Sequence, residues 1–238
     1  MGDVNHRLFV EKYRQLLRGP YLEVGSKDYG STENLRGVVP TGEEYLGVDQ
    51  EAGPGVDVVL DLTMPFEQID ARLGGRRFGT IFCMSVLEHC RSPQRMAENL
   101  TRLLRSGGVL FVSAPFAWKF HAYPNDYWRF TPEGVRLLFP RLWFAPEMGV
   151  WATARPGEFS PLDQQIGKIR FRTTPYRRQR RWSWVIGVAL VRLLRTAGLL
   201  GFLKGFSYVL APTNIMMVGR LPEDSAFAPA EESSSKLP

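Results

Sequence analysis

The feature that most constrains this chain is a series of short apolar segments, each closed by turn or acidic residues. The segments cover residues 21–24, 45–49, 56–61, 80–84 and 109–113. Strands that are apolar on both faces belong in a parallel sheet that helices cover on both sides, because a half-exposed strand alternates between apolar and polar residues. The chain therefore predicts an α/β fold with a doubly wound, mostly parallel sheet.

Helical patterns lie before and between the later segments. Residues 4–17 place apolar side chains on one face. Ser92-Pro93 predicts an N-cap with proline in the first turn, and the expected buried stripe is Met96, Ala97, Leu100, Leu103 and Leu104. Thr131-Pro132 begins another helix in the same way, with an expected buried set of Val135, Leu137, Leu138 and Phe139. Alternating strands and helices imply right-handed crossovers.

The alternation ends near residue 156. We expect four parts, namely a core over 1–156, a basic apolar lid or membrane-surface insertion over 157–206, a last core strand within 207–222, and a disordered tail over 223–238. The uncharged runs of the insertion, 182–191 and 196–203, are much shorter than the roughly 20 residues that a membrane-spanning helix needs.

The positive charge of the chain is concentrated in one segment. The net charge is +6, yet residues 164–222 carry eleven Lys or Arg and no Asp or Glu. Three interpretations remain open, namely a solvated lid over an acceptor pocket, a contact with an anionic membrane surface, and a nucleic-acid contact. We favour a peripheral lid that touches lipid or a lipid-linked acceptor, and we rank nucleic acid lower.

Candidate ligand residues stand at the ends of the predicted strands, where open α/β sheets bind their ligands. Asp49 closes the second strand, and its carboxylate suits the two hydroxyls of a ribose. Gly25 opens a small polar turn after the first strand, which lets a ligand approach the backbone closely. Glu23 precedes that turn. Because a lone buried carboxylate is costly, we expect Glu23 to accept from the turn amides or a ligand ammonium.

Residues 21–139 resemble the class I S-adenosylmethionine-dependent methyltransferases. They are similar to the small bacterial type with Ser-Val-Leu-Glu-His after strand four, here 85–89, and His-x-x-Pro-x-Asp-Tyr-Trp-Arg-Phe-Thr after strand five, here 121–131. The resemblance implies S-adenosylmethionine as cofactor and a last antiparallel strand, matching 214–220. The expected cofactor-binding residues are Glu23, Gly25, Ser26, Lys27, Asp49, Asp61, Leu62, Ser85, Val86 and His89.

The resemblance also gives these residues roles. It places Glu23 and Gly25 at the methionine end of the cofactor, Asp49 at the ribose, Asp61-Leu62 at the adenine and Ser85 beneath the cofactor. The turn departs from the family pattern of alternating glycines, because Lys27 and Tyr29 stand between Gly25 and Gly30. One hypothesis is that Lys27 pairs with the methionine carboxylate.

A hydroxyl acceptor must lose a proton during methyl transfer, and histidine is the usual base near neutral pH. We expect His121 to be this base, Asp126 to orient it or the acceptor, and Arg129 to bind an anionic or polyhydroxyl group. The alternative is a structural loop in which Arg129 pairs with Asp126 and Trp128 packs inward. We expect no metal site, because Cys83 and Cys90 lack histidines at zinc-site spacing.

These residues predict a methyltransferase acting on an oxygen, or with less support a nitrogen, of a small-molecule, sugar or lipid-linked acceptor. The alternative is a catalytically inactive methyltransferase fold that serves as a membrane-surface or nucleic-acid interaction module. A nicotinamide-dependent oxidoreductase is disfavoured, because the turn at 25–30 lacks the middle glycine of the dinucleotide fingerprint. The N-terminus predicts no secretory leader. We expect a cytoplasmic protein or one peripheral at the inner membrane face, and the sequence assigns no oligomeric state.

Overall fold

A computed structural model describes residues 4–30, 35–121, 125–155, 157–162, 182–198 and 214–223. The chain divides into two compact units, one formed by residues 1–162 with 212–238 and the other by 163–211. The first unit contains the whole sheet and every candidate site residue. Of the second unit, the structure describes helix α6, Trp182–Thr196, and the two residues that follow it.

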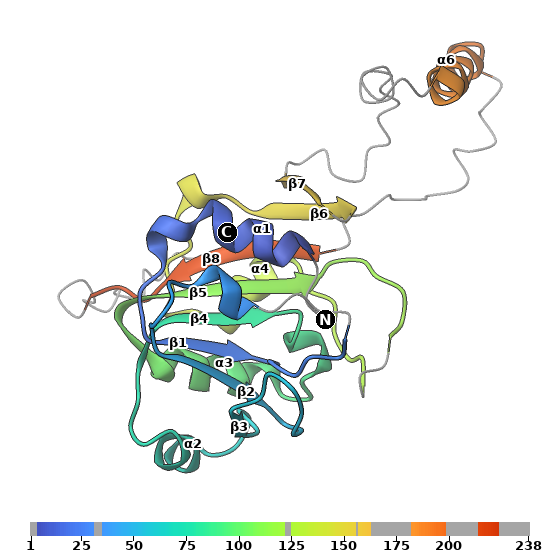
Figure 1. The fold of residues 1–238 in the computed structure, drawn as a ribbon. Coiled ribbons are helices and arrows are strands. Elements are labelled where there is room, and N and C mark those ends of the chain that lie inside the picture. Colours follow the sequence, from blue (N-terminus) through green and yellow to red (C-terminus); the bar gives the residue numbers. More distant parts are fainter. Residues whose placement is uncertain are drawn as a thin grey trace, which may run out of the picture. The chain divides into compact units, whose positions relative to one another are not determined.

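The sheet has eight strands in the order β3-β2-β1-β4-β5-β8-β6-β7 (Figure 1). The strands are β1 Tyr21–Val24, β2 Tyr45–Asp49, β3 Val58–Val59, β4 Phe78–Met84, β5 Leu104–Pro115, β6 Trp151–Arg155, β7 Glu158–Pro161 and β8 Asn214–Arg220. Strands β1 to β5 are parallel, and β8 runs antiparallel to β5. The predicted doubly wound sheet with a last antiparallel strand is confirmed.

Helices cover both faces of this sheet. On one face the core includes residues of α2 (Phe66–Arg72), α3 (Pro93–Leu103) and α4 (Pro132–Leu138). The other face packs against α1 (Val4–Lys12) and the 3-10 turns Arg14–Leu16 and Leu35–Val38. All seven residues of β4 are buried, and Phe82 and Cys83 point to opposite cores. This explains why the central strand is almost entirely apolar, and its one polar side chain, Thr80, bonds to the backbone of Arg18.

Several local predictions were wrong or incomplete. Leu137 is 81% exposed, because α4 turns that side chain away from the core that Val135 and Phe139 enter. Ser92 makes no capping hydrogen bond, whereas the Thr131 side chain accepts from the amide of Gly134, as an N-cap should. The third strand is reduced to Val58–Val59 at the sheet edge, where Val59 is 42% exposed.

The boundary of the core lies further along the chain than predicted. Strand β7, Glu158–Pro161, pairs with β6 and so belongs to the sheet, which moves the boundary from residue 156 to residue 162. The predicted basic segment 168–181 and the tail after residue 223 lie outside the described residues. Among the helices that the structure describes, none is long and apolar enough to cross a membrane.

Candidate cofactor and acceptor site

A cavity of about 480 Å³ opens at the carboxyl ends of the parallel strands. It lies beside β1, which has β2 on one side and β4 on the other, the point where an open sheet reverses its winding and binds ligands. Seven of the predicted cofactor residues line it, namely Gly25, Asp49, Asp61, Leu62, Ser85, Val86 and His89. Glu23, Ser26 and Lys27 are not among the lining residues.

The turn after β1 requires glycine at its first position. Gly25 has φ +70°, and a Cβ atom there would lie 2.7 Å from Cγ2 of Val86. Both the left-handed backbone and the close contact therefore exclude a side chain. The amides of Gly25 and Ser26 donate to the carbonyl of Val48, at 2.9 and 3.1 Å. The turn is thus anchored to β2.

Two carboxylates at the cavity are held by local hydrogen bonds. Asp49 accepts from the amides of Lys27, at 3.2 Å, and Glu51, at 3.0 Å. Asp61 accepts from the amide and hydroxyl of Thr63, at 2.8 and 2.7 Å. Backbone donors of this kind fix the direction in which a carboxylate presents its remaining lone pairs. Both side chains are therefore oriented before any ligand arrives.

The hydrogen-bond partners of Glu23 differ from those predicted. Its carboxylate accepts from the Tyr45 hydroxyl at 2.5 Å and from the backbone amide of Leu35, not from the turn amides. Side chains alternate along a strand, so Glu23 faces away from the cavity that its neighbour Val24 lines. Burial raises the pKa of Glu23 to about 7, although the Tyr45 hydrogen bond works against the shift.

Lys27 also has a protein partner. Its ammonium lies 2.6 Å from a carboxylate oxygen of Glu51 and 5.1 Å from the centre of the Tyr29 ring. The same carboxylate raises the pKa of Lys27 through a hydrogen bond. In this structure the Lys27 ammonium forms an ion pair with Glu51. The hypothesis that Lys27 binds the methionine carboxylate of the cofactor therefore gains no support.

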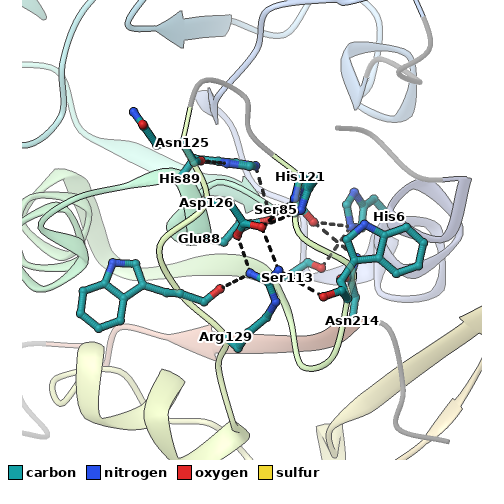
Figure 2. A network of polar contacts seen from close by, with 12 residues as sticks. His6, Ser85, Glu88, His89, Ser113, His121, Asn125, Asp126, Arg129 and Asn214 are labelled. Atoms are coloured by element: carbon teal, nitrogen blue, oxygen red, sulfur yellow. Dashed lines mark hydrogen bonds and ion pairs between the residues drawn. The ribbon is translucent and has the colours of Figure 1, made fainter.

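Ser85 belongs to a buried polar network that the sequence did not indicate. Its φ is +55°, which is unusual for a residue with a side chain. The Nε2 atom of His6 lies 3.4 Å from the Ser85 hydroxyl and 3.0 Å from the Ser113 hydroxyl (Figure 2). Asn214 donates to Ser85 from β8. Complete burial lowers the pKa of His6 to about 3, so the imidazole is neutral.

The predicted acceptor residues come together after β5. Asp126 Oδ2 lies 2.9 Å from the amide and 3.2 Å from the Nδ1 atom of His121, and Arg129 donates to both Asp126 oxygens. The Asp126 side chain is only 1% exposed. The Arg129 hydrogen bond is the main cause that holds the pKa of Asp126 far below its usual range.

The arrangement of Arg129 matches the structural alternative. Besides Asp126, its guanidinium donates to the backbone carbonyls of Trp118, Lys119 and Trp128. Trp128 does not pack fully inward, since it is 39% exposed, but its indole N–H donates to the Cys90 carbonyl at 2.9 Å. Arg129 is therefore a clamp for Asp126 and the surrounding loop, which does not support the expected role of binding an anion.

The acceptor residues are tied to the cavity through His89. The Nδ1 atom of His89 lies 2.6 Å from the Asn125 carbonyl, and the amide of Tyr127 donates to the Glu88 carbonyl. His89, Asn125 and Tyr127 all line the cavity. The His89 and His121 rings are 5.0 Å apart between their centres. The loop after β5 therefore forms one wall of the site through Asn125 and Tyr127, and His121, which is not among the lining residues, lies beside His89 (Figure 2).

Neither cysteine thiol is suited to act as a nucleophile or a metal ligand, although Cys90 lines the cavity. Both Cys83 and Cys90 are free and buried, and burial raises the pKa of each thiol. A protonated thiol is neither a nucleophile nor a metal ligand. Both residues therefore act as packing side chains, as expected from the sequence.

The parallel sheet, the turn at Gly25 and the carboxylate of Asp49 meet at the edge where open α/β sheets bind their ligands. A family model described as a methyltransferase domain matches residues 23–112. The chain is 24% identical over 119 residues to a tRNA U34 carboxymethyltransferase of Campylobacter fetus, which matches 50% of this chain and 39% of that protein. The chain thus spans about two fifths of that relative.

Two further proteins are similar to this chain. A ubiquinone biosynthesis O-methyltransferase of Coxiella burnetii is 50% identical over 38 residues, which is 16% of each chain. The solved structure of an S-adenosylmethionine-dependent methyltransferase from Archaeoglobus fulgidus has a TM-score of 0.51 at 13% identity, covering 90% of this chain and 92% of that chain. The chain carries a class I S-adenosylmethionine-dependent methyltransferase domain, as the sequence predicted, and S-adenosylmethionine is the cofactor of this class.

Proposed function

We propose that the chain is an enzyme that binds S-adenosylmethionine in the cavity above β1 and transfers its methyl group to an oxygen of a small-molecule, sugar or lipid-linked acceptor. The observation that carries the proposal is the cavity of about 480 Å³ with Gly25 and Asp49 on its wall. Its volume lies within the range of about 300–1,000 Å³ typical of small-molecule sites.

The described residues fit this cofactor. Asp49 would accept from the ribose hydroxyls, because two amides already orient its carboxylate. The methionine part of the cofactor would lie over Gly25, because the absence of a Cβ atom there leaves the space next to Val86 open. Asp61, Leu62 and Ser85 would border the rest of the ligand. When bound, S-adenosylmethionine supplies an electrophilic methyl group and a neutral thioether leaving group.

Cofactor binding is tested by titration calorimetry of the full chain with S-adenosylmethionine. We expect binding by the wild type and a loss of affinity of at least about 100-fold in Asp49→Ala, because hydrogen bonds to a charged group contribute roughly 1.5–3 kcal/mol each. Asp70→Asn is the matched control, because Asp70 lies on α2 in an ion pair with Arg77. Absence of binding at millimolar cofactor would favour the alternative of an inactive interaction module.

On the acceptor side, His121 is the proposed base. Asp126 and Lys119 offer only oxygen acceptors to its Nδ1 atom, so Nδ1 carries the proton and Nε2 keeps the lone pair that a base needs. Asp126 is a positioning residue in this scheme, and Arg129 holds Asp126. We favour an oxygen acceptor over a nitrogen acceptor, because an alcohol must lose its proton during methyl transfer and His121 could accept that proton.

The acceptor class is tested with radiolabelled S-adenosylmethionine and separate pools of glycans, lipids, small metabolites and RNA. We expect label in the small-molecule, glycan or lipid pool, with none for Asp49→Ala. The proposal keeps nucleic acid as the less favoured partner, although one similar protein is a tRNA-modifying enzyme. Label confined to RNA would overturn this acceptor assignment while leaving the cofactor proposal intact.

Helix α6 supports a peripheral contact with a membrane. Trp182, Ile186, Leu190 and Leu193 are each more than half exposed, and their spacing places them on one face of the helix. An apolar helix face next to a basic segment is typical of helices that lie on anionic lipid surfaces. The proposed location is therefore cytoplasmic, at the inner membrane face.

Flotation with phosphatidylglycerol vesicles tests this contact. We expect the wild type to float and Ile186→Asp/Leu190→Asp to remain in solution. Ser183→Asp/Thr196→Asp adds the same charge at exposed polar positions of α6 and should still float. Equal flotation of both double variants would remove the lipid proposal.

A further inference from the structure

Glu88, His89 and His121 form a cluster that the proposed reaction does not fully use. Glu88 and His89 belong to the 3-10 turn Leu87–His89 after β4, and His121 follows β5. One nitrogen or oxygen atom from each residue lies within 4.8 Å of the corresponding atoms of the other two. Figure 2 shows the three side chains meeting beside Asp126. Sequence reasoning missed this cluster, because 32 positions separate the two histidines and no spacing of known metal sites links them.

Both imidazoles are oriented in the way that metal-binding histidines usually are. His89 Nδ1 lies 2.6 Å from the Asn125 carbonyl, and His121 Nδ1 lies 3.2 Å from the Asp126 carboxylate. These partners can only accept, so each Nδ1 atom must donate and each Nε2 atom presents a lone pair. A carbonyl or carboxylate behind the ligating ring is the usual outer shell of a bound metal ion.

Glu88 supplies a buried acidic group with an unused oxygen. It is 1% exposed, and among the described residues its Oε2 atom has no hydrogen-bond partner. Its Oε1 atom lies 3.9 Å from His89 Nε2. The nearby cation, Arg129, is committed to Asp126. Because burying an unpaired carboxylate is expensive, the cluster is incomplete as a purely structural feature.

We propose that Glu88, His89 and His121 bind a divalent transition-metal ion such as Zn²⁺. Two imidazole nitrogens and one carboxylate are a common protein ligand set for zinc, with a further position open to water or substrate. An ion at about 2.1 Å from each donor would draw the three atoms closer together. Of the three proposed ligands, His89 also lines the cavity, so the proposed metal site adjoins the space for cofactor and acceptor.

The consequence for catalysis rests on the proposed function. A metal ion at this site would take the Nε2 lone pair of His121, so the imidazole would act as a ligand and not as the base. The acceptor hydroxyl would then lose its proton to water because the ion lowers the pKa of a coordinated oxygen. The methyl group moves from the sulfonium to that oxygen, and the cofactor leaves as a neutral thioether.

The test uses the full chain after treatment with a chelator and dialysis. Co²⁺ is added first, since its visible absorption reports coordination, and Zn²⁺ binding is then measured by calorimetry. We expect one ion per chain in the wild type. Affinity should fall by at least about 100-fold in Glu88→Gln, His89→Gln and His121→Gln, because even outer-shell changes cost roughly 10–100-fold. Glu98→Gln, at an exposed position on α3, is the matched control.

Further measurements separate this inference from its alternatives. Asp126→Asn should weaken Co²⁺ binding by about 10–100-fold without removing a ligand, and circular dichroism checks that every variant is folded. Cofactor calorimetry is run on the same samples, so a chain that binds Zn²⁺ but no S-adenosylmethionine contradicts the proposed function alone. The metal proposal is overturned if the wild type binds neither ion at millimolar concentration, or if all three ligand variants bind as the wild type does.

Discussion

The two walls of the site are built in different ways. The cofactor wall consists of strand ends and the turns that follow them, so Gly25, Asp49 and Asp61 are held by residues close to them in sequence or on the next strand. The acceptor wall consists of side chains from two distant segments that meet through Asp126, Arg129 and the Asn125 carbonyl. The first wall therefore depends on backbone geometry and the second on a buried polar network.

The largest expected effect comes from breaking that network. Arg129→Ala would leave the buried Asp126 carboxylate without its cation, and we expect a loss of about 3 kcal/mol in the free energy of unfolding, the lower end of the range for buried pairs because the Arg129 side chain is 30% exposed. Arg77→Ala breaks the more exposed pair with Asp70 and should cost less than about 1 kcal/mol. Urea denaturation measures both. Equal, small losses would mean that the acceptor wall does not depend on this pair.

The next effect concerns Glu23, which faces away from the cofactor wall. Its folded-state pKa is about 7 and its ordinary value is 4.5, so the folded protein takes up a proton between these values. Stability should therefore be highest at the acidic end of this window and fall by up to ~3 kcal/mol as pH rises from 4.5 through 7.

Glu23→Gln isolates this contribution. The variant keeps the size of the side chain but cannot ionise, so the difference in unfolding free energy between it and the wild type should grow as pH rises. Chemical denaturation at several pH values measures that difference. A constant difference from pH 4.5 to pH 8 would show that the burial of Glu23 does not shift its pKa.

A smaller effect tests the backbone of the cofactor wall. Gly25→Ala must adopt φ +70° and place its Cβ against Val86, so we expect a destabilisation of roughly 1–3 kcal/mol together with weaker cofactor binding. Gly74→Ala is the matched control, because Gly74 has φ +63° with no atom near the new Cβ. Thermal unfolding and calorimetry with S-adenosylmethionine compare the two. Equal losses would show that strain alone, and not the contact with Val86, makes glycine necessary.

The smallest effect is expected for Lys27→Ala. Its ion pair with Glu51 is exposed to solvent, so its loss should leave the free energy of unfolding almost unchanged. We expect unchanged affinity for S-adenosylmethionine by calorimetry. A tenfold or greater loss of affinity would restore the hypothesis that the ammonium meets the methionine carboxylate, and would show that Lys27 changes partner when the cofactor binds.

The contrast between the walls explains what the sequence could predict. The sheet and the positions of Asp49, Asp61 and Ser85 follow from apolar runs and the residues that end them, because the carboxyl ends of parallel strands share one edge. The orientation of Glu23 was missed, because its neighbours Leu22 and Val24 are both buried and a four-residue strand is too short to show which face Glu23 occupies. The β6–β7 hairpin was missed because it follows directly after the last predicted helix–strand alternation.

The acceptor wall was predicted only in part. The sequence motif after β5 predicted that His121, Asp126 and Arg129 act together. In the structure Asp126 contacts both His121 and Arg129. The approach of Glu88 to His121 and the contacts of His6 with Ser85 and Ser113 depend on tertiary packing between residues 33 to 107 positions apart. Neither periodicity nor residue spacing in the sequence indicates such contacts, so only the three-dimensional structure reveals them.

The measurement that tests the central claim most directly is a crystal structure with S-adenosylhomocysteine. We expect its adenosine to lie in the cavity beside Asp61 and Leu62, with the ribose hydroxyls on Asp49 and the amino-acid end over Gly25. If that crevice stayed empty, or if the ligand bound elsewhere on the molecule, the assignment of this cavity as the cofactor site would be wrong.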